Sequence, residues 1–199
     1  MVFEFALLGL VLTAIVAILV YTLITGVPPV PTTPRVRATM MALVPDDFRG
    51  IIYELGAGWG GLAFSLARRF PDCRIVAYEL SPLPWAFTRL RQVAFPCPNL
   101  TVRRADYRRV SLTPASLVMC YLFPAGMARL RGKFEAELAT GTLIVSNTFA
   151  VPGWRPAAVR RAHDLYASTV YLYVMPHCAL GDEGQAPVAR EVVEVSGIQ

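Results

Sequence analysis

Residues 53–61 form a glycine-rich segment with one acid inside it and others further along the chain. The segment reads Tyr-Glu-Leu-Gly-Ala-Gly-Trp-Gly-Gly and stands between a strand-like run and a helix-like run. Gly56, Gly58 and Gly60 permit a tight turn and let a ligand approach the backbone without meeting a Cβ. Glu79 ends the next predicted strand, where a carboxylate can accept hydrogen bonds from ribose hydroxyls. Together these residues predict a nucleoside-binding site.

The type of nucleoside depends on the neighbouring acids, because Gly56, Gly58 and Gly61 also fit the G-x-G-x-x-G pattern of dinucleotide sites. Glu54 stands two residues before the first glycine, where a carboxylate repels a pyrophosphate but attracts the ammonium of a methionine moiety. Asp106 closes the third predicted strand, where an adenine amino group is expected, although an Asp before a turn often caps a loop instead. The acids favour S-adenosylmethionine over NAD.

Strand-like and helix-like segments alternate around these residues. The predicted strands cover 51–55, 74–79, 100–103, 116–121 and 142–146, and the predicted helices cover 34–44, 62–70, 82–94 and 126–139. This alternation predicts βαβ units and a parallel sheet with helices on both faces. A later strand, 169–175, has no obvious crossover helix before it. We expect it to be antiparallel, with 157–165 or 188–195 as its hairpin partner.

Composition limits the possible classes of protein. The chain has 199 residues, of which 55% are hydrophobic, so it holds one domain with an appendage and is not intrinsically disordered. Its four cysteines are widely spaced, which favours neither a zinc site nor a disulfide framework. His163 and His177 have no ligand-like partners nearby in the sequence, and no metal site is predicted.

The N-terminal segment is strongly apolar. Residues 5–25 carry no charge, and about 20 apolar helical residues are enough to cross a bilayer. Arg35 and Arg37 follow this segment and no basic residue precedes it, so the sequence predicts a single-pass membrane protein with a cytoplasmic C-terminal domain. The predicted organisation is a transmembrane anchor at 1–25, a Pro-rich linker at 26–34, a catalytic domain at 35–176 and an acidic tail at 177–199.

The charge of the domain points to an anionic neighbour. Residues 26–176 hold eighteen basic residues against nine acidic ones. An excess of this kind suits a lipid surface or a nucleic acid. The apolar N-terminal segment favours the lipid bilayer, and no nucleic acid is expected as a partner.

Several motifs resemble known families. Glu54-Leu-Gly-Ala-Gly-Trp-Gly60 resembles motif I of class I methyltransferases. The wider pattern is similar to the mitochondrial lysine methyltransferases that act on ATP synthase subunit c and the adenine nucleotide translocase, and to their small bacterial and archaeal relatives. The similarity covers roughly 30–175 and is carried by Thr33–Met41, Ala77–Pro82, Tyr121–Pro124 and Ile144–Phe149.

The resemblance implies a Rossmann-like class I methyltransferase fold, with a mostly parallel seven-stranded sheet, that uses S-adenosylmethionine. By motif position, Glu54 and the loop from Gly56 to Gly60, including Trp59, would hold the methionine part. Glu79 would hold the ribose and Asp106 the adenine. Three residues depart from the family pattern: Trp59 replaces a small or acidic residue, Gly61 replaces a common basic residue, and Asn147 stands where relatives often have histidine.

A methyl acceptor needs a pocket that excludes water and tolerates cationic groups, which aromatic rings provide. Tyr121, Phe123 and Phe149 are the candidates, because they lie at or just beyond the C-terminal ends of predicted strands. Asn147 and Trp154 are second choices. The alternative for Phe149 and Trp154 is that they merely pack a loop.

The sequence therefore predicts a membrane-anchored, S-adenosylmethionine-dependent methyltransferase that methylates lysine in a membrane protein. Three alternatives stay open. The acceptor could be an aminolipid or a small molecule, the chain could be an NAD-dependent oxidoreductase, or it could be a non-catalytic adaptor that binds the cofactor.

Overall fold

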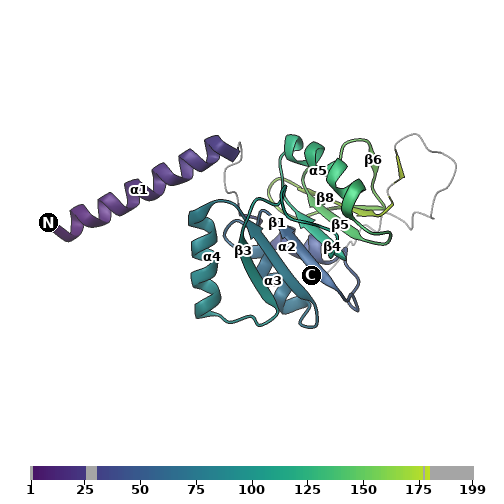
Figure 1. The fold of residues 1–199 in the computed structure, drawn as a ribbon, viewed down its shortest axis with the longest axis horizontal. Coiled ribbons are helices and arrows are strands. Elements are labelled where there is room, and N and C mark those ends of the chain that lie inside the picture. Colours follow the sequence, from purple (N-terminus) through teal and green to yellow (C-terminus); the bar gives the residue numbers. More distant parts are fainter. Residues whose placement is uncertain (1, 26–30, 177, 180–199) are drawn as a thin grey trace.

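A computed structural model describes residues 2–25, 31–176 and 178–179, and Figure 1 shows how their elements are arranged. The helices are α1 (Val2–Thr25), α2 (Pro34–Met41), α3 (Gly61–Arg69), α4 (Pro82–Ala94) and α5 (Pro124–Glu137). The strands are β1 (Ile51–Leu55), β2 (Arg74–Glu79), β3 (Leu100–Arg104), β4 (Leu117–Cys120), β5 (Leu143–Asn147), β6 (Trp154–Arg155), β7 (Ala158–Arg161), β8 (Thr169–Val174) and β9 (Cys178–Ala179).

Seven strands form the main sheet in the order β3-β2-β1-β4-β5-β8-β7. The five strands from β3 to β5 are parallel, and β8 and β7 continue the sheet in antiparallel pairing. This confirms the predicted mostly parallel seven-stranded Rossmann-like sheet and the antiparallel last strand. The partner of β8 lies in the predicted segment 157–165, whereas the other option, 188–195, lies outside the described residues. The short β6–β9 pair was not predicted.

The strand order reverses at β1. The chain runs outward from β1 to β2 and β3, then returns to the other side of β1 with β4 and β5. Ligands of open α/β sheets bind beyond the carboxyl ends of the strands at such a reversal. The loops that follow β1, β2 and β4 meet there, and the glycine-rich segment is the loop after β1.

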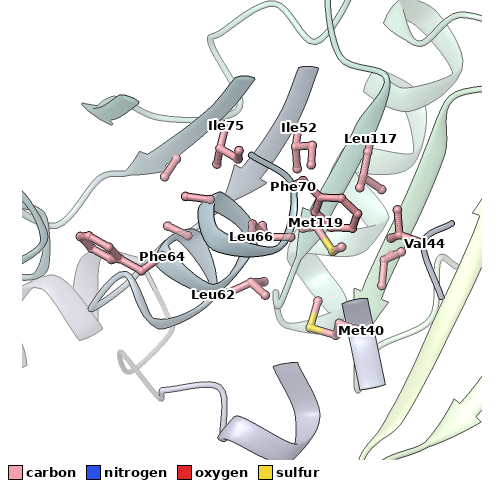
Figure 2. Close-up of a cluster of buried hydrophobic side chains, with 14 of the residues drawn as sticks. Met40, Val44, Ile52, Leu62, Phe64, Leu66, Phe70, Ile75, Leu117 and Met119 are labelled. Carbon is pink, nitrogen blue, oxygen red and sulfur yellow. The ribbon is translucent and has the colours of Figure 1, made fainter. Parts of the chain in front are cut away.

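Apolar side chains cover both faces of the sheet. On one face, α2 and α3 pack against the strands through a cluster that includes Met40, Leu66 and Phe70, as Figure 2 shows. On the other face, α5 contributes Met127, Leu130 and Phe134 to a second cluster. Burial on both faces explains why β4 is apolar along its whole length.

Helix α2 begins as its sequence predicts. The Thr33 side chain accepts a hydrogen bond from Val36 N at 3.3 Å, and Pro34 occupies the first helical position. Val36 and Met40 are buried, and α2 packs against α3, β5 and β8. A helix that precedes the sheet in the chain is therefore fixed beside the start of α3.

The predicted membrane anchor is corrected by the structure. Residues 2–25 are helical, as expected, with Glu4 in the first turn. Crossing a bilayer requires one helix that is both long and apolar enough for the hydrocarbon core. Within residues 2–25, 31–176 and 178–179, no helix meets that requirement. The predicted transmembrane anchor and the single-pass membrane localisation that was inferred from it are therefore wrong.

Two other predicted segments lie largely outside the described residues. Of the linker predicted at 26–34, the structure describes 31–33, and α2 begins at Pro34. Of the acidic tail predicted at 177–199, it describes only 178–179, which form β9. The domain boundaries therefore stay predictions.

Candidate functional site

The glycine loop joins β1 to α3 and is tied to the end of β2. The N–H groups of Gly56 and Ala57 both donate to Tyr78 O at 2.9 Å. Gly56, Gly58 and Gly60 have φ angles of 80°, 53° and 76°, in the left-handed region that glycine adopts at little cost. The predicted tight turn is therefore present, and its glycines are required by the backbone conformation.

Two of these glycines have different surroundings. A Cβ on Gly60 would lie 2.6 Å from Thr88 Cγ2, whereas a Cβ on Gly58 would have no atom within 4 Å. Gly60 is therefore needed for packing against α4, and Gly58 borders open space that a ligand can fill. Thr88 is fully buried and donates its hydroxyl to Gly58 O at 3.1 Å. Sequence reasoning missed Thr88, because nothing local distinguishes it from other helical residues.

Glu79 holds the loop in place. Its Oε2 accepts a hydrogen bond from Gly58 N at 2.7 Å, and its Oε1 accepts one from Ser81 N at 2.7 Å. The side chain is buried, at 8% exposure. Each carboxylate oxygen has a second lone pair, so Glu79 can still accept hydrogen bonds from a ribose. The ribose contact stays a prediction, to which the structure adds a role in fixing the loop.

Glu54 is a buried acid with an unsatisfied oxygen. It lies in β1 at 4% exposure, and among the described residues its Oε2 has no hydrogen-bond partner. Burial, and next the neighbouring Glu79, raise the pKa of Glu54 to about 8, whereas Arg37 lowers it. An orphaned buried acceptor is costly and often marks a missing ligand. The arrangement suits a cationic group such as the predicted ammonium.

We expect Glu54→Gln to stabilise the ligand-free protein at pH 8 but not at pH 4. In the unfolded chain Glu54 ionises near its ordinary value of 4.5, whereas the folded protein keeps the proton up to about pH 8. The unfolded state therefore holds fewer protons between these values, and the free energy of unfolding falls as pH rises through that window. Glutamine removes this loss, which amounts to no more than about 4 kcal/mol at pH 8.

Urea denaturation at several pH values measures this effect. Asp46→Asn is a suitable control, because the Asp46 side chain is 83% exposed. The variant Glu54→Gln should gain stability relative to the control as pH rises. A loss of stability at pH 8 would contradict the assignment of a neutral, buried Glu54.

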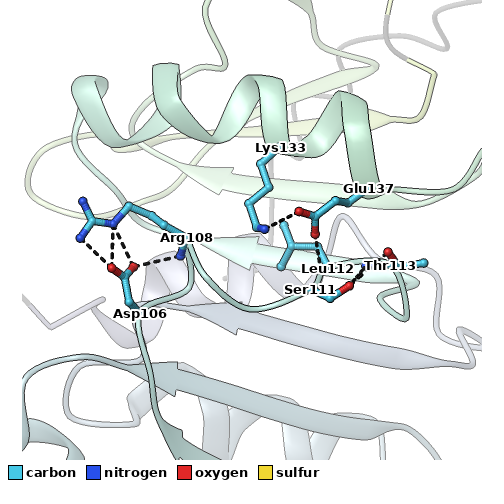
Figure 3. A network of polar contacts seen from close by, with 7 residues as sticks. All are labelled: Asp106, Arg108, Ser111, Leu112, Thr113, Lys133 and Glu137. Carbon is cyan, nitrogen blue, oxygen red and sulfur yellow. Dashed lines mark hydrogen bonds and ion pairs between the residues drawn. The ribbon is translucent and has the colours of Figure 1, made fainter.

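Asp106 is already engaged by a neighbour. Figure 3 shows the Arg108 guanidinium against its carboxylate, with Nε 2.9 Å from Oδ1 and Nη2 2.7 Å from Oδ2. Arg108 N also donates to Oδ1 at 3.0 Å. The side-chain hydrogen bond from Arg108 lowers the pKa of Asp106. Asp106 is therefore a loop cap, which was the alternative interpretation, and an adenine amino group would have to share this carboxylate. The adenine contact stays a prediction.

The three candidate aromatic residues lie together beyond β4 and β5. Phe149 stacks on Tyr121, with ring centroids 6.2 Å apart and an interplanar angle of 13°. It also stacks on Phe123, at 5.5 Å and 25°. Phe123 is 39% exposed, so the stack reaches the surface. The contacts bring the three candidates together, and their role as an acceptor pocket stays a prediction.

Asn147 and Thr148 connect β5 to this aromatic stack. Asn147 ends β5 and is buried, and its Oδ1 accepts a hydrogen bond from Thr148 Oγ1 at 3.1 Å. Thr148 has a φ of 65°, a strained conformation for a β-branched residue that is held only where the surroundings enforce it. Ser146 donates its hydroxyl to Phe149 O at 2.6 Å and helps to close this turn. The bend positions Phe149 against its neighbours.

The two tryptophans in question differ in role. Trp154, a second choice for the acceptor pocket, is 2% exposed and packs against Phe134 and Tyr173 in the core. Its burial favours a packing role, in the core rather than in a loop as the alternative interpretation held. Trp59 lies in the glycine loop and packs edge-to-face on Phe87 of α4, with ring centroids 5.4 Å apart. Its contact with a cofactor stays a prediction.

Arg37 of α2 reaches the start of α3 and was not among the predicted site residues. A Cβ on Gly61 would lie 2.8 Å from Arg37 Nη1. The missing side chain at Gly61 thus makes room for a guanidinium from another element. A signal was present in the sequence, since Gly61 replaces a residue that is commonly basic in similar proteins.

The described part of the chain contains no group of three His, Cys, Asp or Glu side chains that could hold a metal ion. The candidate site consists of the loop, three acids, Arg37 and the aromatic stack, and their roles stay predictions.

Comparison with known proteins gives consistent matches. Residues 54–158 match the family described as "ANTKMT methyltransferase domain". The chain is 28% identical over 156 residues to a protein-lysine N-methyltransferase of Saccharolobus islandicus, covering 75% of this chain and 94% of that protein. It is 32% identical over 111 residues to the mouse adenine nucleotide translocase lysine N-methyltransferase, covering 55% of this chain and 48% of that protein. It thus spans about half the length of the mouse protein.

A similar fold occurs in a solved structure, an RNA methyltransferase from Salinibacter ruber in complex with S-adenosyl-L-homocysteine. The two chains are 26% identical with a TM-score of 0.63, and the match covers 81% of this chain and all of that one.

Proposed function

Since the chain belongs to the ANTKMT methyltransferase family, we propose that it transfers a methyl group from S-adenosylmethionine to the side-chain amine of a protein lysine. The family and the related structures make the chain a methyltransferase that uses S-adenosylmethionine. The alternatives of an NAD-dependent oxidoreductase and a non-catalytic adaptor are therefore dropped. The acceptor is the part of the function that is proposed.

The residues at the ends of β1 and β2, and in the loop after β1, fit the cofactor. One observation carries this fit. The buried Glu54 Oε2 has no hydrogen-bond partner among the described residues, and it precedes a glycine loop with open space at Gly58. Glu54 would bind the ammonium group, Glu79 the ribose hydroxyls and Asp106 the adenine amino group. Gly56, Gly58 and Gly60, with Trp59 between them, would line the methionine part. When bound, S-adenosylmethionine supplies an electrophilic methyl carbon on a sulfonium.

The chain's main chemical task is then to deliver a neutral amine. Deprotonating a lysine of ordinary pKa, about 10.4, costs roughly 4 to 5 kcal/mol at pH 7. Burial against the stack of Tyr121, Phe123 and Phe149 would lower that cost by disfavouring the charged form. The same rings attract the cationic product through cation–π interactions. The Asn147 amide would accept a hydrogen bond from the amine and orient its lone pair.

A protein lysine is favoured by the names of the two relatives, both lysine N-methyltransferases. The bilayer as a partner and a membrane protein as acceptor were expected mainly from the predicted anchor, and they form no part of the proposal. An aminolipid, a small molecule and, from the Salinibacter structure, an RNA are the competing acceptors.

Transfer of a labelled methyl group tests the proposal. The full-length chain is incubated with a cell extract and methyl-labelled S-adenosylmethionine, and protein, lipid and RNA are then separated. We expect label in protein that yields N-methyl-lysine on hydrolysis, and none with Gly58→Arg, whose side chain fills the open space at the loop. Label confined to lipid, RNA or small molecules would refute a lysine acceptor.

A further inference from the structure

Arg37 is held rigidly in the first turn of α2. Its N–H donates to Thr33 O at 3.0 Å, and its Nη1 donates to Thr32 O at 2.6 Å. The guanidinium lies over Gly61, with Cζ 3.6 Å from the position of a Cβ there. A guanidinium carries five N–H donors in a fixed plane, so most of them are left to bind another group.

The surroundings of Arg37 carry an excess of positive charge over negative charge. Gly61 begins α3, and the N-terminus of a helix carries a partial positive charge. Arg91 and Arg68 are close enough to act on Arg37, and no ion pair among the described residues includes any of these three arginines. Such a cluster favours a bound anion.

The nearest carboxylate does not supply that anion. Glu54 acts electrostatically on Arg37, but it is buried and stays protonated near neutral pH for the reasons given above. Its Oε2 has no hydrogen-bond partner in the described part of the chain. Among the residues that the structure describes, Arg37 therefore has no anionic partner, and the neutral Glu54 has no hydrogen-bond partner for its Oε2. The two residues act on each other electrostatically.

We propose that Arg37 binds the carboxylate at the methionine end of S-adenosylmethionine, so that Arg37 and Glu54 together recognise the amino-acid zwitterion. A ligand with an ammonium and a carboxylate on one carbon satisfies both residues at once. A guanidinium binds a carboxylate through two parallel hydrogen bonds. The inference rests on the methyltransferase assignment but not on the identity of the acceptor. It also explains Gly61, because any side chain there would meet the Arg37 guanidinium.

Calorimetry with three ligands tests the role of Arg37. S-adenosylhomocysteine has the whole amino-acid end, its decarboxylated analogue keeps only the ammonium, and 5′-methylthioadenosine lacks both groups. We expect Arg37→Ala to weaken binding of S-adenosylhomocysteine about 10- to 100-fold, as for a lost charged hydrogen bond, and to leave the other two ligands unchanged. Arg35→Ala is the matched control, since Arg35 lies on the same helix and donates to His163 O.

A second variant tests the same contact in case Arg37→Ala fails to fold. Gly61→Ala would push the guanidinium aside, so it should weaken S-adenosylhomocysteine selectively, and it should add little to the effect of Arg37→Ala, as expected for two changes at one contact. Equal losses for all three ligands, or no loss in either variant, would overturn the proposal. If the unmodified chain bound none of the three ligands, the methyltransferase assignment would fail instead.

Discussion

Replacing Glu79 with alanine is expected to weaken binding of S-adenosylhomocysteine at least about 100-fold. The Glu79 carboxylate accepts hydrogen bonds from Gly58 N and Ser81 N, and each charged hydrogen bond contributes about 1.5 to 3 kcal/mol. The substitution releases the glycine loop and also removes the proposed ribose acceptor. Both effects act on the same ligand, which is why a large loss is expected. Calorimetry on the full-length chain measures it.

Asp72→Ala provides the control for Glu79→Ala. Asp72 is another acid close to β2, but its side chain is 67% exposed and pairs only with Arg49 among the described ion pairs. The Asp72→Ala variant should bind S-adenosylhomocysteine with the same affinity as the unmodified chain. If the dissociation constant of Glu79→Ala lay within a few-fold of that of the unmodified chain, the carboxylate would neither fix the loop nor contact the ligand.

Replacing Phe149 with alanine is expected to lower kcat/KM for the acceptor about 100-fold and to leave the affinity for S-adenosylhomocysteine unchanged. Phe149 lies between Tyr121 and Phe123 in the stack, so its removal lets water reach the acceptor site. The expected loss corresponds to a barrier increase of about 2.7 kcal/mol, which we attribute to water that solvates the amine once the ring is removed. Initial rates of label transfer and calorimetry provide the two readouts.

Two further variants serve as controls for Phe149→Ala. Phe149→Leu keeps an apolar side chain and should recover part of the rate. Tyr166→Ala removes an aromatic ring that is 82% exposed and should change neither readout. An unchanged kcat/KM in Phe149→Ala would remove the aromatic stack from the proposed acceptor site, and a parallel loss of S-adenosylhomocysteine affinity would show a general disruption instead.

Much of the fold follows from local sequence. The predicted strands 51–55 and 74–79 and the helix 82–94 coincide with β1, β2 and α4, because each is an apolar run or period with clear start and stop residues. The predicted helix 126–139 begins instead at Pro124, since proline suits the first helical position. The β6–β9 pair has two residues in each strand, which is too short to produce a readable pattern.

Some residues of the candidate site could be predicted from local sequence and others could not. The glycine loop and Glu79 are readable because their spacing reflects local geometry. The role of Arg37 could not be predicted from the sequence, because its contact with Gly61 depends on how α2 packs beside α3. The pairing of Asp106 with Arg108 spans two residues and could have been weighed from the sequence. The N-terminal segment shows the opposite error, because composition alone suggested a membrane span that the structure does not contain among its described helices.

The reversal of strand order at β1 has an evolutionary consequence. Residues proposed to bind the methyl donor come from the half of the sheet that contains β1, β2 and β3, and those proposed to surround the acceptor follow β4 and β5 on the other side. Mutations can therefore alter one half while the other keeps its packing. A lineage built on this architecture can acquire new methyl acceptors through changes after β4 and β5 without having to reinvent how the donor is captured.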